Sequence, residues 1–178
     1  GTIMAILLTA EQMRHTKASN PFQIKNPGQV TNQFTITEAP KAAETLKLTD
    51  TKQIVELKAF LKKYDMTSIS TDEVKVVGSL LYKNAMISRR SCGMFISGDG
   101  ASDANGKQTD THVKFNAIAL FNEKLEDTIA HFNSDPAIPR REGATDYLQG
   151  MVDANHAINA LAFFINSNSS NLSIDERA

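Results

Sequence analysis

The chain has 178 residues, 41% of them hydrophobic and 22% charged, which is the composition of a folded globular protein and not of a disordered chain. Its 19 basic and 20 acidic residues give a formal net charge of −1, which excludes a global electrostatic attraction to nucleic acid or anionic membranes but not a local basic patch. No apolar run approaches the roughly 20 residues of a membrane-spanning helix, and the single cysteine excludes an internal disulfide and a cysteine-based zinc cluster.

Residues 1–49 are predicted to form a short helix followed by an extended arm. The helix signal covers residues 5–17, and the segment after it is rich in proline and amide side chains but poor in large apolar ones. Apolar residues alternate with polar ones in "QFTITE" (33–38) and "TLKLT" (45–49), which indicates short strands. Such an arm cannot bury a core of its own, so we expect it to lie against the rest of the chain or against a partner.

The next unit, residues 50–166, is predicted to be a helical core. Its first helix covers residues 50–64 and repeats its apolar residues every three or four positions. Either Asp50 or Thr51 can cap the start of this helix. The residues on its apolar face are Ile54, Leu57 and Leu61.

A second helix is predicted for residues 70–88. Ser70 and Glu73 have the spacing of a capping box, in which each side chain accepts a hydrogen bond from the other residue's backbone N–H. The helical period that follows is carried by Val74, Val77, Leu81 and Ala85.

Two further helices are predicted, over residues 118–132 and 145–165. The second of them is apolar almost all round, which predicts a central position in the fold. Residues 167–178 are polar and are predicted to be a flexible tail. The predicted fold is therefore mostly α, a bundle of four to five helices with an extended N-terminal arm.

The main structural alternative is an α+β fold with a hairpin around residues 92–117. Residues 113–117 alternate between apolar and polar side chains as a strand does, and "CGMFIS" (92–97) supplies a second apolar run. If these two runs pair, they enclose the glycine-rich loop "SGDGASDANGKQTD" (97–110).

The glycine-rich loop resembles a calcium loop or a phosphate-binding loop in composition but not in spacing. With Gly106 at the sixth position of an EF-hand loop, the first and last ligand positions are Ala101 and His112, neither of which supplies a carboxylate. A P-loop requires glycine at Ala101 and a serine or threonine at Gln108. We therefore expect a solvated connection that holds no metal and no cofactor.

Cys92 is a candidate nucleophile, with a histidine as its base and Asp110 to orient that histidine. No local motif supports this arrangement, and the apolar neighbours of Cys92 predict a buried core thiol instead. No two histidines have the i, i+4 spacing of a zinc motif, so no metal site is expected. The candidate histidines are His112, His131 and His156.

Two arginine pairs are candidate contacts for an anion or a nucleic acid. Arg89 and Arg90 follow the second predicted helix, where the negative end of a helix dipole would stabilise them. Arg140 and Arg141 lie in a proline-containing turn, and Lys83 can share a face with the first pair. If the pairs converge in space, they form a site for phosphates.

These features predict a non-enzymatic helical protein that binds a protein partner or a second copy of itself through its arm and loops, as an assembly subunit, adaptor, inhibitor or effector, including one encoded by a phage or virus. The first alternative is a single-stranded nucleic-acid-binding or coat-type subunit that uses the arginine pairs. The second alternative is a small Cys/His-dependent enzyme. No membrane association is expected, and because no signal peptide is found we expect a cytoplasmic protein or one delivered into a host cell.

Overall fold

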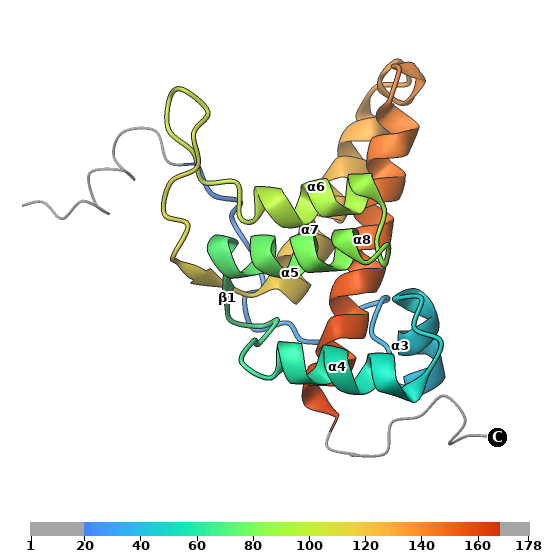
Figure 1. Cartoon of the computed structure of the whole chain (residues 1–178). Coiled ribbons are helices and arrows are strands. Elements are labelled where there is room, and N and C mark those ends of the chain that lie inside the picture. Colours follow the sequence, from blue (N-terminus) through green and yellow to red (C-terminus); the bar gives the residue numbers. More distant parts are fainter. Residues whose placement is uncertain (1–19, 168–178) are drawn as a thin grey trace, which may run out of the picture.

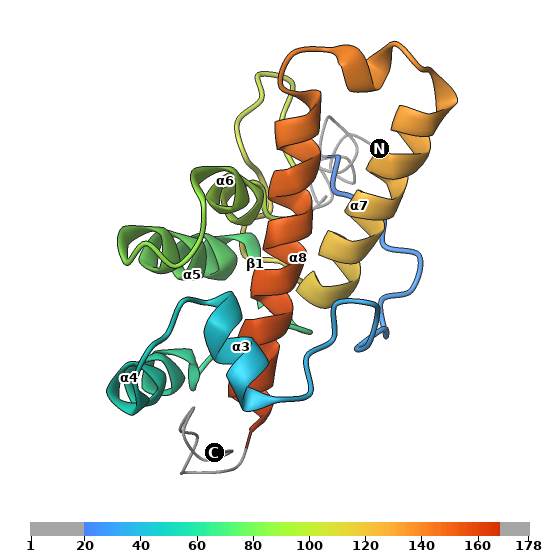
Figure 2. The ribbon, with the colours of Figure 1, turned by 90° about the vertical axis from the view of Figure 1, so that its right-hand side faces the viewer.

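The computed structural model describes residues 20–167, and the fold of this part is mostly helical, as predicted (Figures 1 and 2). The predicted N-terminal helix and C-terminal tail lie outside the described residues, apart from Ser167. The α-helices are α3 (Ala39–Thr45), α4 (Thr51–Leu61), α5 (Thr71–Lys83), α6 (Arg89–Ser97), α7 (Ala117–Ser134) and α8 (Ala144–Asn166). The other elements are β1 (Ile69–Ser70), β2 (Lys114–Phe115) and the short 3-10 helix η1 (Ile138–Arg140).

Helix α8 is the central element of the fold. Helices α3, α4, α6 and α7 all pack against it, and Figure 2 shows it passing through the middle of the molecule. Small residues on α8 allow its neighbours to approach closely: a Cβ atom added to Gly150 would lie 2.8 Å from the Cβ of Arg90 on α6. The prediction of a central last helix is confirmed.

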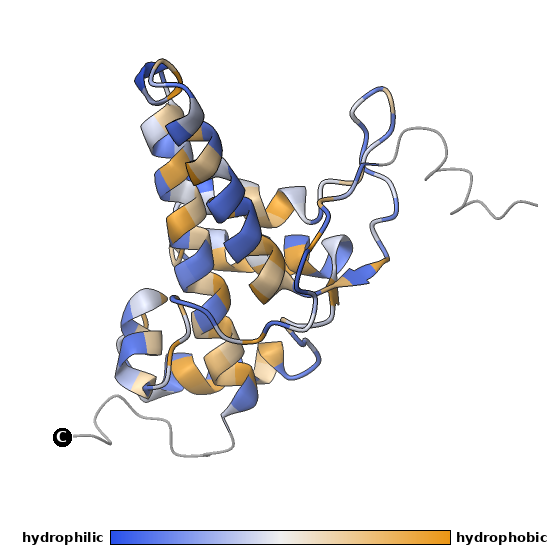
Figure 3. Cartoon of the chain, turned by 180° about the vertical axis from the view of Figure 1, so that it is seen from behind, coloured by the Kyte–Doolittle hydropathy of each residue, from blue (hydrophilic) through white to orange (hydrophobic). Residues whose placement is uncertain are grey.

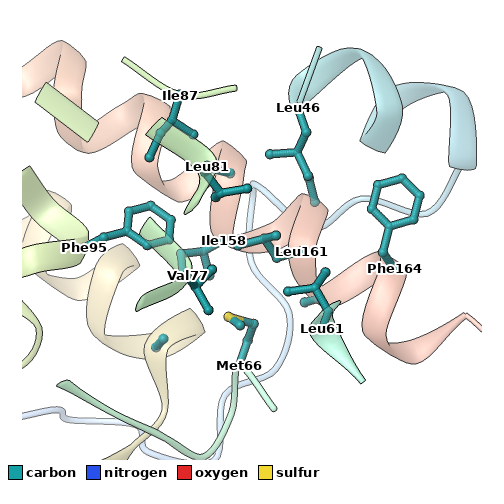
Figure 4. Close-up of a cluster of buried hydrophobic side chains, with 14 of the residues drawn as sticks. Leu46, Leu61, Met66, Val77, Leu81, Ile87, Phe95, Ile158, Leu161 and Phe164 are labelled. Carbon is teal, nitrogen blue, oxygen red and sulfur yellow. The ribbon is translucent and has the colours of Figure 1, made fainter. Parts of the chain in front are cut away.

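The hydrophobic core lies where α5, α6 and α8 meet (Figure 4). Phe95 of α6, Val77 and Leu81 of α5 and Ile158 of α8 are all fully buried there. Burial of a side chain of this size stabilises the fold by about 1.5–3 kcal/mol. The core continues toward α3 and α4 through Leu46, Leu61, Met66, Leu161 and Phe164.

The predicted capping box is present at the start of α5, and the predicted cap of α4 is Asp50, which also forms a capping box. Asp50 caps α4 together with Gln53, and Ser70 caps α5 together with Glu73. The Glu73 carboxylate also forms an ion pair with Lys114 of β2, next to the antiparallel pairing of β1 with β2. Burial acts to raise the pKa of Glu73, but the bonds to Lys114 and to the Ser70 N–H outweigh it and hold that pKa below its ordinary value.

The second predicted helix is two helices in the structure. Helix α5 ends at Lys83, and Ala85 adopts the left-handed conformation with φ of 57°. This turn lets the N–H of Met86 donate to the carbonyl of Leu81 at 2.9 Å, a Schellman-type end. Ser88 then caps α6, a helix that the periodicity of the sequence did not predict.

The alternative hairpin around residues 92–117 is wrong, because residues 89–97 form α6. Cys92 and Phe95 are buried on one helical face, at the i, i+3 spacing of a helix and not the alternation of a strand. The short strand β2 pairs with β1, and the register joins Phe115 to Ile69.

The strands predicted for residues 33–38 and 45–49 are also absent from the structure. Residues 33–38 are irregular, and α3 with its C-terminal turn occupies the second stretch. Leu46 and Leu48 are both buried because Lys47 takes a φ of 58° and reverses the chain between them. Helix α3, which lies within the predicted arm, packs against α8.

Residues 20–38 lie against the core and are tied to α7 by buried polar side chains. The Glu123 carboxylate accepts hydrogen bonds from the backbone N–H groups of Lys25 at 2.6 Å and Asn26 at 2.9 Å. The Asn116 amide donates to the carbonyls of Pro27 and Gln29 at 2.8 and 2.7 Å. This part of the predicted arm therefore packs on its own chain.

Candidate functional site

The first arginine pair lies at the beginning of a helix and not at the end of one. Arg89 and Arg90 are the first two residues of α6, so the predicted stabilisation by a helix C-terminus does not apply to them. Arg90 instead forms an ion pair of 2.8 Å with Asp146 in the first turn of α8.

The other predicted contact residues lie on different elements. Arg140 and Arg141 are exposed at the hydrophilic tip that joins α7 to α8, which Figure 3 shows in blue. Lys83 is the last residue of α5. The structure thus distributes the five cations over α5, α6 and this tip, and a nucleic-acid site built on them stays a prediction.

The glycine-rich loop is folded on itself and on the core. Asp99 is buried and accepts a hydrogen bond from the Thr71 hydroxyl at 3.3 Å. The Asp103 carboxylate accepts from the backbone N–H groups of Asn105 and Lys107 at 2.9 and 3.0 Å. Both carboxylates therefore bind groups of their own chain. Within residues 20–167, no cluster of three or more His, Cys, Asp or Glu side chains has the arrangement of a metal site.

Cys92 is a core thiol. It is buried, its Sγ lies 3.8 Å from the carbonyl oxygen of Gly78, and burial raises the pKa of the thiol. Among the predicted bases, His112 and His131 are exposed, and the half-buried ring of His156 packs edge-on against another aromatic ring at a centroid distance of 5.1 Å. A raised pKa opposes the thiolate that nucleophilic catalysis requires.

We expect iodoacetamide to alkylate Cys92 in the folded protein at least about tenfold more slowly than in urea-unfolded protein. Because the folded-state pKa is raised, half-maximal reactivity should also lie at a higher pH in the folded protein. Mass spectrometry of timed, quenched samples measures both quantities. A folded thiol that reacts at neutral pH as fast as the unfolded one would support the Cys/His enzyme instead.

A cavity of about 330 Å³ between α3, α6 and α8 brings a serine, a histidine and an aspartate together. The Ser91 hydroxyl is hydrogen-bonded to a backbone carbonyl of α8, and the Asp153 carboxylate accepts from Gln149 at 2.9 Å. The His156 ring packs on Phe34. In the described part of the chain no hydrogen bond joins these three side chains to one another, so the cavity does not have the hydrogen-bond relay of a catalytic triad.

The structure also contains a groove that sequence reasoning missed, between α4 and α5. The two helices run antiparallel, with β1 between the end of α4 and the start of α5 (Figure 1). Two adjoining hollows of about 420 and 540 Å³ form the groove, and both are lined by Phe60 and Leu80. The other apolar residues of the α4–α5 groove are Leu48, Leu57, Val76 and Met86.

The groove exists because α4 and α5 have different main packing partners. Helix α4 packs against α8, whereas α5 packs against α6. Each helix also carries apolar side chains on the flank that faces the groove: Phe60 is half-buried and Val76 is 51% exposed. The left-handed turns after α3 and α5 direct the chain so that Leu48 and Met86 line one end. We call this the α3 end of the groove.

Charged side chains line the margins of the groove. The Asp72 carboxylate accepts from the Thr111 hydroxyl at 3.1 Å, and the Lys75 ammonium donates to Gln108 at 2.8 Å. Glu56 lies 4.0 Å from Lys52. Two further lysines that line the groove, Lys47 and Lys83, have no carboxylate within 4 Å in the described part of the chain.

No family model, no curated protein and no solved structure matches this chain. None of the helices within residues 20–167 is both long enough and apolar enough to cross a bilayer. What the protein does is therefore inferred from its own surface.

Proposed function

We propose that this is a non-enzymatic interaction protein that binds a helical segment of a partner protein in the α4–α5 groove. The observation that carries the proposal is the set of apolar side chains that both helices and the turns beside them contribute to the groove, from Leu48 to Val76, between polar margins. Amphipathic helices commonly bind in such grooves through apolar side chains spaced one helical turn apart.

The size and composition of the groove support a transient complex. Three apolar anchors of a partner, each contributing about 2–3 kcal/mol, give on the order of 6–9 kcal/mol before the entropy of association and ordering is subtracted. We therefore expect a dissociation constant on the order of 10 μM or weaker. Lining side chains that are already partly buried, such as Phe60, lose little further freedom on binding.

The groove takes the place of the arm and the loops as the proposed binding surface. Residues 20–38 are held on α7 by Glu123 and Asn116, and the glycine-rich loop satisfies its own carboxylates. The Phe60 and Val76 side chains, by contrast, offer apolar surface that a partner can cover.

A displayed library of helical peptides, selected on the full chain, tests the proposal. The selected peptides should lose at least about tenfold in affinity for Val76→Asp, because a carboxylate would then lie in the apolar groove. Val55→Asp is the matched control: Val55 is 53% exposed on α4, close to the 51% of Val76 on α5, but it does not line the groove. Equal affinity for both variants would contradict the proposal.

A further inference from the structure

We infer that the partner helix is acidic at one end and that this end binds at the α3 end of the groove. This inference rests on the proposed function and specifies the chemistry and the direction of the bound segment. It follows from the uneven distribution of charge along the groove.

The α3 end of the groove is positive. Lys47 follows α3 directly, and Lys83 is the last residue of α5, so both lie where these two helices end. Neither ammonium has a carboxylate partner within the described residues. Glu56, which lines the same hollow as Lys47, lies near Lys52, so two lysines and one glutamate line this end. A bound helix with carboxylates at this end would supply the missing counter-charges.

The opposite end, next to β1, carries one acidic and one basic side chain. Asp72 is in the first turn of α5, and Lys75, one turn further on, donates to the side chain of Gln108. A carboxylate of the partner placed here would meet the Asp72 carboxylate as well as the Lys75 ammonium, so it would gain less than at the α3 end, where two lysines face one glutamate. The charge pattern therefore favours one of the two directions in which a helix can lie in the groove, and it disfavours a basic partner.

The same peptide selection tests this inference when the selected sequences are read for charge. We expect an apolar stripe with Asp or Glu clustered at one end. The double variant Lys47→Glu/Lys83→Glu should weaken binding by more than about tenfold, and raising NaCl from about 50 mM to about 500 mM should weaken binding to the unmodified chain severalfold. The matched control, Lys62→Glu/Lys107→Glu, changes the charge equally at two exposed positions that do not line the groove.

The possible outcomes separate this inference from the proposed function. Peptides that depend on Val76 but are neutral or basic, and that bind the Lys47→Glu/Lys83→Glu variant normally, would overturn the charge inference while the groove remained the binding site. Peptides that are indifferent to Val76→Asp would overturn both. Acidic peptides that lose affinity for both groove variants, and for neither control, would support both.

Discussion

Replacing Gly78 by alanine is expected to lower the free energy of unfolding by about 3 kcal/mol or more. Gly78 is buried in α5 where α6 crosses it, and an added Cβ would lie 2.4 Å from the Cβ and 2.8 Å from the Cγ of Phe95. Phe95 has no room to move aside, because it is fully buried and its ring meets that of Phe121 at a centroid distance of 5.6 Å. Helices α5 and α6 would have to separate, which urea denaturation followed by circular dichroism would detect.

The same substitution at Gly93 is the control. Gly93 lies on the exposed side of α6, and an added Cβ would meet no atom within 4 Å. Alanine is favoured over glycine inside a helix, so Gly93→Ala should raise stability by up to about 1 kcal/mol. If both variants changed stability by the same amount, the close crossing of α5 and α6 would be wrong.

Replacing Glu123 by glutamine is expected to destabilise the protein by about 2–3 kcal/mol. The Glu123 side chain is buried, and its carboxylate accepts two backbone N–H groups from the segment that precedes α3. Glutamine keeps a single acceptor oxygen and places an amide N–H against one of these donors, so one hydrogen bond is replaced by a repulsion. Urea unfolding measures the loss, and hydrogen exchange should show faster exchange at Lys25 and Asn26.

Asp127→Asn is the matched control for this effect. Asp127 lies one turn further along α7, and its exposed carboxylate is 4.0 Å from the ammonium of Lys25. An exposed pair of this kind contributes at most about 1 kcal/mol, so the variant should keep both its stability and its exchange rates nearly unchanged. Unchanged exchange at Asn26 in Glu123→Gln would mean that Glu123 does not hold the N-terminal segment.

Helices with local signals could be predicted from the sequence. The start of α4 at Asp50 and the start of α5 at Ser70 are determined by side chains within three residues, and α8 is apolar along its length. Helix α6 has such a signal in Ser88, but the apolar period of α5 can be extended to this residue through the turn made by Ala85, so no new helix was predicted. The left-handed residue that ends a helix is usually glycine, so an alanine at this position does not mark the end of α5 in the sequence. The apolar period of α5 therefore continues past it.

The candidate site could not be predicted, because it depends on contacts between distant parts of the chain. Val76 lies off the apolar stripe of α5, which runs through Val74 and Val77, and in sequence it is a single exposed valine; it lines a groove only because α4 lies beside α5. Leu48 enters the groove only because Lys47 reverses the chain. Similarly, the local sequence around Glu123 is typical of an exposed helix residue. Its buried position depends on Lys25, 98 residues earlier, which the fold places next to it.

The contact between a selected peptide and Phe60 tests the central claim most directly. Isotope-filtered nuclear Overhauser measurements on the full chain, with the peptide bound, would identify the protons that lie within about 5 Å of each other. We expect contacts from the peptide's apolar side chains to the Phe60 ring and the Leu80 methyl groups, which both hollows share. Contacts confined to the arginines at the start of α6 or to the tip between α7 and α8 would contradict the account.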